Sequence, residues 1–314
     1  MSGETDSLLH SAPVIAYTDS IRQFPDSPAY YFERGGILYS LQHYAEARKD
    51  VEKALSLNPR EKGYYFALGQ IDEADGQWQA ALAHYRQAIQ HTPDDRQIRL
   101  QIAYVLFAHQ QFDSMFHEID TLIAQFPHSS EAYGLQARAY EATGDTAKAL
   151  AAMHKAVQED PQNYNATMGM GDLLSKAKDP EAISWYDKAL QIDSTQAEPW
   201  YAKAQFYESV SAVPHALECY RQCINTDRDY LKAYIGLSRL YGSGHDWEKG
   251  RSVADLAIRV DPTYAEAFYQ RGICNEHLGN RQAAINDYQQ CMALDKNNKS
   301  AKLALQRLQE ASAR

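Results

Sequence analysis

ALSLNPREKGYYFALGQ, residues 54–70, contains a proline that belongs to a regular series. Counting from Pro59 in steps of 34 residues reaches Pro25, Pro93, Pro127 and Pro161. Proline lacks a backbone N–H and restricts the residue before it to extended conformations, so a helix ends ahead of it. A fixed period of about 20 to 50 residues is typical of repeat architectures. The series therefore predicts a chain of repeats, each ending near a proline.

Small residues follow the same period. With the proline at position 32, repeats begin at residues 28, 62, 96, 130, 164, 197, 231 and 265, and the fifth repeat is one residue shorter. Two helices cross closely only where small side chains lie between them. Small residues dominate position 8 (Gly35, Gly69, Ala103, Ala137, Gly171, Ala204, Ser238, Gly272), position 20 (Ala47, Ala81, Met115, Ala149, Ala182, Ala216, Gly250, Ala284) and position 27 (Ala54, Ala88, Leu122, Ala156, Ala189, Cys223, Ala257, Cys291). We therefore expect two closely crossing helices in each repeat.

The spacing of the apolar residues indicates helices rather than strands. In WQAALAHYRQAIQ, residues 78–90, they recur at i, i+3, i+4 and i+7. Polar or glycine-containing turns such as ADGQW, residues 74–78, separate the two helices of a repeat. Large aromatic side chains are expected to fill the gaps from position 24, which holds Tyr85, Tyr186, Tyr220 and Tyr288. Three repeats lack the proline and have Ser194, Arg228 or Lys296 in its place. There, the polar residues that precede this position are expected to end the second helix.

The pattern YYFALGQ…GQWQAALAHYRQAIQHTP resembles the tetratricopeptide repeat, and eight such units cover residues 28–298. The resemblance implies an all-α fold, a right-handed α-solenoid of eight helix-turn-helix units whose first helices line a concave groove. Residues 13–27 fit a half repeat with a second helix only, and residues 299–314 fit a capping helix with Ser300 as its N-cap. Residues 1–12 are expected to be a flexible N-terminus. The stretches DPEAISWYDKALQID and FYQRGICNEHLGNRQAAINDYQQCMALD look like repeat arrays of bacterial envelope lipoproteins.

Composition narrows the partners and the compartment. The net charge is −10 and no run of Lys and Arg exceeds a pair, so a basic face for nucleic acid is not expected. No apolar segment is long enough to span a membrane and no secretory signal is visible, which predicts a cytoplasmic protein. If an upstream signal has been removed, the alternative is the periplasm or an outer-membrane lipoprotein. The four cysteines form no CxxC pair and are expected to be reduced thiols.

The resemblance places positions 2, 5, 6, 9, 12 and 13 of each first helix on the concave side. Position 5 is mostly large and apolar, which predicts a groove that binds a peptide or a partner helix through aromatic anchors. Packing of the same stripe against neighbouring helices is an equal alternative. Charges of both signs nearby, among them Lys232 and Glu266, suggest a partner of mixed charge. The predicted contact residues are Phe32, Phe66, Tyr104, Phe107, Arg138, Met168, Tyr201, Arg239 and Tyr269.

The resemblance also implies a scaffold without catalysis or cofactor, and no catalytic, cofactor-binding or metal-binding residue is predicted. The alternative is a metal-dependent or other enzyme that uses a site on the repeat surface. Its best candidates are spaced i, i+4 along one helix and include the side chains that zinc prefers: His215, Cys219, Cys223 and Asp227. A row of this length spans about 18 Å, too far for one ion. Cys223 also falls at position 27, where a small packing residue is expected.

Overall fold

The computed structural model describes residues 8–9 and 11–310. These residues form helices joined by turns, with no strand among them, and this confirms the predicted all-α class. The chain divides into two compact units, residues 1–159 and residues 160–314. Predictions for residues 1–7, 10 and 311–314, which concern the N-terminus and the end of the capping helix, lie outside the described residues.

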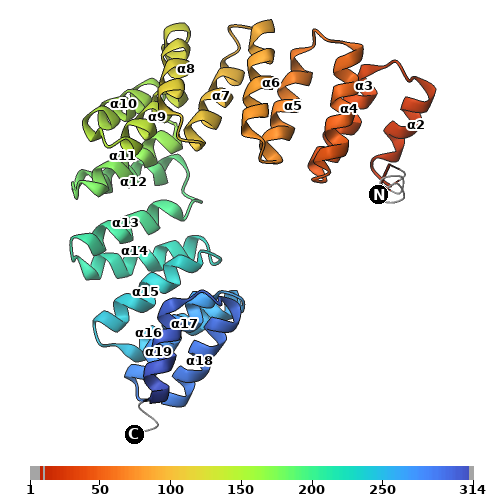
Figure 1. Ribbon diagram of the computed structural model, residues 1–314. Helices are drawn as coiled ribbons and strands as arrows, with labels where there is room; N and C mark the ends of the chain where they lie inside the picture. The colour runs from red at the N-terminus through yellow and green to blue at the C-terminus, as the bar shows by residue number, and fades with distance from the viewer. Residues whose placement is uncertain (1–7, 10, 311–314) are drawn as a thin grey trace. The chain divides into compact units, whose positions relative to one another are not determined.

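Helices of the first unit follow one another as antiparallel hairpins (Figure 1). They are α2 (Ile15–Gln23), α3 (Pro28–Ser40), α4 (Tyr44–Leu57), α5 (Lys62–Ala74), α6 (Trp78–His91), α7 (Arg96–Ala108), α8 (Phe112–Gln125), α9 (Ser130–Ala142) and α10 (Thr146–Glu159). Each first helix packs most closely on its own partner, as α5 does on α6, and within this unit each hairpin then packs on the next. The first helices of this unit, from α3 to α9, begin at the residues where the sequence period starts a repeat.

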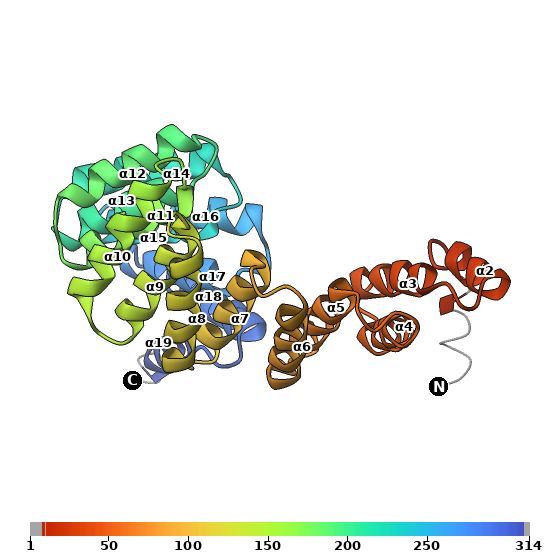
Figure 2. The same cartoon turned by 90° about the horizontal axis from the view of Figure 1, so that it is seen from above.

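The second unit continues the same order. Its helices are α11 (Tyr164–Lys176), α12 (Glu181–Ile192), α13 (Glu198–Ser209), α14 (Val213–Thr226), α15 (Leu231–Ser243), α16 (Trp247–Val260), α17 (Ala265–His277), α18 (Arg281–Leu294) and α19 (Lys299–Glu310). Figures 1 and 2 show α19 beside α18 at the C-terminal end, where Ala301 and Leu308 are buried. The expected N-cap of α19 was wrong: Asn298, and not Ser300, caps it, because the Asn298 Oδ1 accepts the N–H of Ala301 at 3.0 Å.

Small and large residues interlock where the helices of a hairpin cross. Every residue of positions 8, 20 and 27 is buried, as expected from their size. A Cβ added at Gly69 would lie 2.4 Å from the ring of Tyr85, and one at Gly272 would lie 2.6 Å from the ring of Tyr288. Both rings are fully buried. Glycine thus makes room for a tyrosine from the facing helix, and this close packing sets the distance between the two helices.

The second helices end as the sequence predicts. Asn58, between the last residue of α4 and Pro59, is extended with φ −140°. Where proline is missing, an aspartate carboxylate forms a turn by accepting the backbone N–H two residues later, at 2.9–3.0 Å. The aspartates that do this are Asp193, Asp227 and Asp295. Polar residues therefore replace proline at these three helix ends.

The turn inside each hairpin requires one residue with positive φ. The residues that adopt it, all at position 15 of their repeats, are Gln42, Gly76, Gln110, Gly144, Lys178, Ser211, His245 and Gly279. Only three of them are glycine, although this conformation is unfavourable for other residues. Five of the hairpins therefore hold a mildly strained turn.

Candidate functional site

In the first unit, the predicted contact residues lie on first helices but are not all open to solvent. Phe32 of α3 and Phe66 of α5 are half-buried, with ring centroids 5.0 Å from Tyr64 and 5.3 Å from Tyr85 respectively. Part of each ring therefore packs against a neighbouring helix, α5 of the next hairpin for Phe32 and α6 of the same hairpin for Phe66. This agrees with the alternative that position 5 packs against neighbouring helices.

Three other predicted residues of the first unit come together. Tyr104, which is 38% exposed, and Phe107 extend from α7, and the exposed Arg138 extends from α9. The Arg138 guanidinium lies 4.8 Å from the centroid of the Phe107 ring, within the range of a cation–π contact. Burial raises the pKa of Tyr104, and the negative charge of Glu131 adds to the shift. The three side chains form a small aromatic and basic surface across two repeats.

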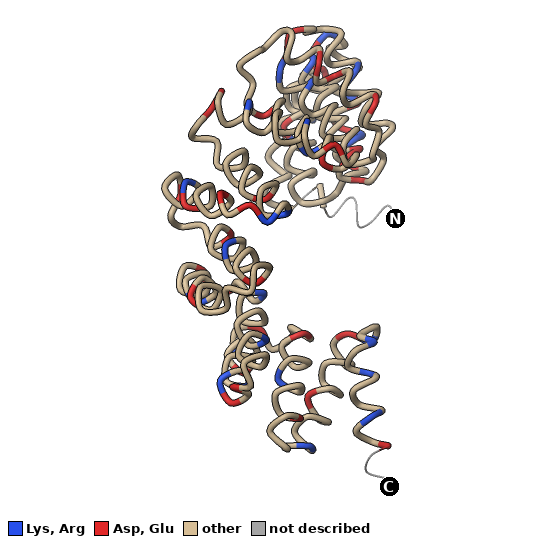
Figure 3. Tube along the Cα trace, turned by 90° about the vertical axis from the view of Figure 1, so that its left-hand side faces the viewer, with Lys and Arg blue, Asp and Glu red and all other residues tan. Residues whose placement is uncertain are grey.

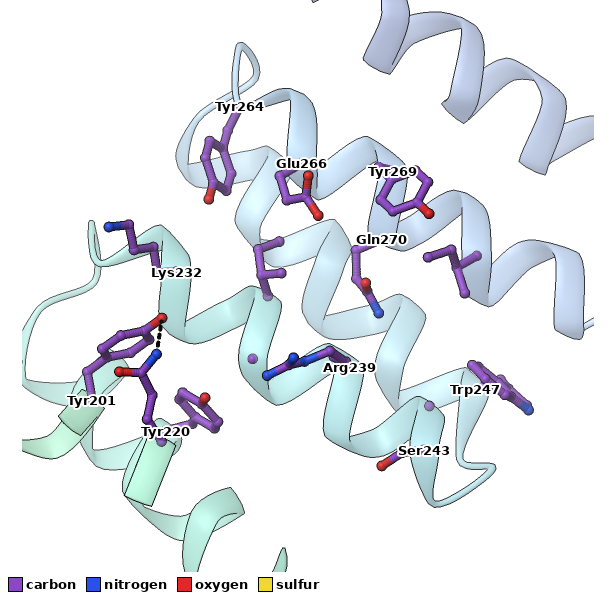
Figure 4. Close-up of a pocket in the computed structure, with 15 residues that line it drawn as sticks. Tyr201, Tyr220, Lys232, Arg239, Ser243, Trp247, Tyr264, Glu266, Tyr269 and Gln270 are labelled. Carbon is purple, nitrogen blue, oxygen red and sulfur yellow. Dashed lines mark hydrogen bonds between the residues drawn. The ribbon is translucent and has the colours of Figure 1, made fainter. Parts of the chain in front are cut away.

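The second unit brings its predicted residues around a pocket of about 580 Å³. Tyr201 of α13, Arg239 of α15 and Tyr269 of α17 all line it (Figure 4). Position 5 of two repeats and position 9 of the repeat between them therefore meet at one site. Ile235, also at position 5, contributes to the wall. The pocket combines aromatic rings with polar groups and is open, as expected of a peptide-binding surface.

Met168 lies in a neighbouring hollow rather than in this pocket. That hollow, of about 440 Å³, shares Tyr201, Gln205 and Lys232 with the first, so the two adjoin. Met168 itself is only 6% exposed and packs in a core cluster with Tyr186 and Phe206. It serves mainly as a core residue.

A chain of polar contacts joins two residues that line the pocket, Tyr220 and Arg239, through Glu208. The Tyr220 hydroxyl donates to the Glu208 carboxylate, and Arg239 of the next repeat donates to both oxygens of Glu208 at 2.9 Å. Burial raises the pKa of Tyr220 strongly, and the Glu208 contact adds to the shift, so this hydroxyl stays protonated and remains a donor. Arg239 is thus held in place by Glu208. The sequence predicts Arg239 as a contact residue but not this pairing, which depends on side-chain reach between repeats.

Glu266, which the sequence indicates only as one of the charges near the groove, also lines the pocket. It follows the start of α17 and is half-buried, and burial raises its pKa, with a further contribution from the negative charge of Asp295. Its acidic type at position 2 was visible in the sequence. Its burial was not, because burial depends on side chains that the fold brings together, and Tyr264 and Tyr269 line the same pocket.

The row proposed for the enzyme alternative does not converge on one point. Cys219 and Cys223 are buried in the core of the second unit, where burial raises their pKa values to about 11 and about 12. The thiolate form that binds metals is therefore disfavoured. His215 stacks on Tyr207 at 5.0 Å, and the Asp227 carboxylate forms the turn after α14. In the part of the chain that the structure describes, no three His, Cys, Asp or Glu side chains gather as metal ligands would.

Two further expectations concern the cysteines and membranes. All four cysteines are free and buried. Two of them, Cys223 and Cys291, occupy position 27, a column of small packing residues. Across residues 8–9 and 11–310, every helix is too short or too polar to cross a bilayer.

Comparison with known proteins gives the family. Three family models, each described as tetratricopeptide repeat, match residues 28–61, 59–192 and 237–309. A DnaJ homolog subfamily C member 7 homolog from Schizosaccharomyces pombe is 23% identical over 88% of this chain, and an Hsp70-Hsp90 organizing protein from Triticum aestivum is 21% identical over 72%. The chain spans only 65% of the length of the former and 39% of the latter.

Solved structures agree on the fold. A tetratricopeptide repeat protein from Parabacteroides merdae is 16% identical and covers 90% of this chain and 98% of its own, with a TM-score of 0.53. The C-terminal part of a TPR repeat-containing protein from Cytophaga hutchinsonii is 20% identical and covers 71% of this chain and 92% of its own, also with a TM-score of 0.53. The three family models, which together match more than half of the chain, agree with the helical hairpins and their columns of small residues and show that the chain belongs to the tetratricopeptide repeat family.

Proposed function

We propose that the chain is a protein-interaction scaffold that binds a peptide or a partner helix in the pocket between α13, α15 and α17. The observation that carries this proposal is the meeting of Tyr201, Arg239 and Tyr269 from three consecutive first helices around one open pocket. Aromatic rings and arginine are the residues that most often anchor protein interfaces. The name of the wheat relative, an organizing protein for Hsp70 and Hsp90, agrees with such a role.

The proposed partner is a protein rather than a nucleic acid. Lys and Arg are interspersed with Asp and Glu along both units (Figure 3), and the net charge is −10. Counter-ion release from a phosphate backbone requires a basic surface, which this pattern does not offer. We propose no catalytic activity for the chain itself. The cytoplasmic location, with the periplasm or outer membrane as the alternative, stays a prediction that fractionation of the source cells would check.

The test selects binders from a displayed library of random peptides on the immobilised full chain. We expect enriched peptides with apolar anchors, whose affinity falls about tenfold or more in a Tyr201→Ala/Tyr269→Ala variant. Circular dichroism verifies that the variant is folded. The matched control is Leu294→Ala/Leu303→Ala, which removes exposed apolar side chains of the same unit away from the pocket.

The control should bind like the wild type. Failure to enrich any peptide, or equal affinity of the selected peptides for the wild type and the tyrosine variant, would show that this pocket is not the binding site.

A further inference from the structure

Glu266 is an acidic side chain without a counter-ion in the candidate pocket. In Figure 4 its carboxylate is seen between the rings of Tyr264 and Tyr269. Within the described residues, no hydrogen bond or ion pair of this carboxylate occurs, and the charge that contributes to its raised pKa is the negative one of Asp295. A half-buried carboxylate beside a second carboxylate is destabilised in its charged form. A cation from outside the chain would relieve this cost.

The position of Glu266 in the first turn of α17 does not by itself explain its burial. An acidic residue there is favoured by the helix dipole. Glu198 shares position 2 of its repeat, lies in the first turn of α13 and is exposed, so it gains from the dipole without losing solvation. Glu266 gains no more from its helix than Glu198 does, yet it is additionally desolvated. Its burial therefore belongs to the pocket rather than to helix capping.

The cations that line the pocket are not available to Glu266. Arg239 is engaged by both oxygens of Glu208. Lys232 is exposed, and Figure 4 shows its amine directed away from Glu266. A solvated lysine loses little by remaining unpaired, whereas a desolvated carboxylate gains much from a partner. The charged group of the pocket that would gain most from a counter-ion is therefore the carboxylate of Glu266.

We infer that Glu266 binds a cationic side chain, arginine or lysine, that the protein partner inserts between Tyr264 and Tyr269. This inference rests on the proposed function and specifies the partner's chemistry. Both rings offer faces on which a guanidinium or ammonium group can stack, and the carboxylate supplies charge-assisted hydrogen bonds at the end of the pocket. Arginine fits best, because its planar group can stack and pair at the same time.

The test repeats the peptide selection with the full chain carrying Glu266→Gln, which keeps the shape of the side chain and removes its charge. Glu218→Gln is the matched control, because it removes one carboxylate from an exposed position of α14 outside the pocket. One enriched basic peptide is then synthesised, and its affinity for the three proteins is measured. A second peptide with its basic residue replaced by norleucine completes the cycle.

We expect peptides selected on the wild type and on Glu218→Gln to be rich in arginine or lysine, and those selected on Glu266→Gln to lack this preference. The basic peptide should bind Glu266→Gln about tenfold more weakly than it binds the wild type. The norleucine peptide should bind Glu266→Gln and the wild type equally. Enrichment that is unchanged by Glu266→Gln, or no basic preference at all, overturns the inference. In that case binding that still depends on Tyr201 and Tyr269 leaves the proposed function standing, whereas absence of any binder overturns both.

Discussion

At the scale of single residues, the contact between a glycine and a buried tyrosine recurs in both units. The ring of Tyr85 occupies the space where Gly69 would carry a side chain, and Tyr186, Tyr220 and Tyr288 do the same for Gly171, Gly236 and Gly272. A fully packed core cannot move a ring aside for an added methyl group at low cost. The glycine is therefore required by the facing tyrosine rather than by the helix that contains it.

Gly69→Ala should destabilise the first unit by about 1–3 kcal/mol, because the new methyl group would overlap the Tyr85 ring. Gly134→Ala is the matched control: it lies in the equivalent first helix α9, and nothing lies within 4 Å of the added Cβ. The control should be neutral or stabilising by up to about 1 kcal/mol, since alanine is the better helix former. Urea unfolding measures both. Equal effects of the two substitutions would contradict the packing argument.

At the scale of elements, the turns between paired helices differ in strain. Gly76, Gly144 and Gly279 adopt positive φ at no cost, whereas Ser211 adopts a φ of 59° with a side chain. The left-handed conformation costs a non-glycine residue roughly 1–2 kcal/mol. Every hairpin of a repeat thus has the same turn geometry, but the backbone strain of the turn is higher where the residue with positive φ is not glycine.

Ser211→Gly should stabilise the hairpin of α13 and α14 by about 0.5–1 kcal/mol. Glycine relieves the backbone strain at positive φ, and the greater entropy of the unfolded chain offsets part of this gain. The reverse change, Gly144→Ala, should destabilise by about 1 kcal/mol, although no atom lies within 4 Å of its Cβ. Thermal unfolding of both variants is the measurement. A destabilising Ser211→Gly would show that the serine side chain contributes more than its backbone costs.

Much of this element structure could be predicted from the sequence. The starts of the first helices follow from the repeat period, which the columns of small residues mark. Residues such as Ala81 and Ala88 are small and buried because they lie where two helices cross closely. Positive φ could be predicted at Gly144 but not at Gln110 or Lys178, where the closure of the hairpin overrides local preference. The half-buried state of Phe66 fits the alternative of packing against neighbouring helices, but its partner ring on the facing helix could not be predicted.

At the scale of the whole molecule, buried tyrosines are common to both units and make the fold sensitive to alkaline pH. Burial raises the pKa of Tyr85 in the first unit and of Tyr186, Tyr220 and Tyr288 in the second, and neighbouring carboxylates add to each shift. A raised pKa in the folded state contributes stability that is complete below the unfolded value of about 10. This stability is lost as the pH rises toward the folded value, since only the unfolded chain releases the proton.

The free energy of unfolding should therefore fall above about pH 10 by roughly 1.4 kcal/mol per pH unit for each such tyrosine. Tyr288→Phe should lower stability by about 1–2 kcal/mol at pH 8, through the lost hydrogen bond to Glu276, and should also reduce the alkaline slope. Urea unfolding at pH 8 and pH 11 measures both effects. Tyr39→Phe, which alters an exposed side chain, is the control, and parallel pH profiles for Tyr288→Phe and wild type would contradict the prediction.

The candidate site could be predicted only in part at this scale. Column positions brought Tyr201, Arg239 and Tyr269 to one pocket, because their place in each first helix fixes the face they occupy. The isolation of Glu266 and the pairing of Arg239 with Glu208 could not be predicted, since both depend on distances between side chains of different repeats. The predicted contact residues of the first unit stay predictions until binding is measured.

The polar link between repeats limits how this array can be rebuilt. Glu208 at position 12 meets Arg239 at position 9 of the next repeat, and Glu276 at position 12 meets Arg307 of α19 in the same way, at 2.6 and 2.7 Å. An extra hairpin spliced in after α14 would separate Glu208 from its arginine. A designer lengthening the protein would have to give the insert both an arginine at its ninth residue and a glutamate at its twelfth, so that each junction remains neutralised.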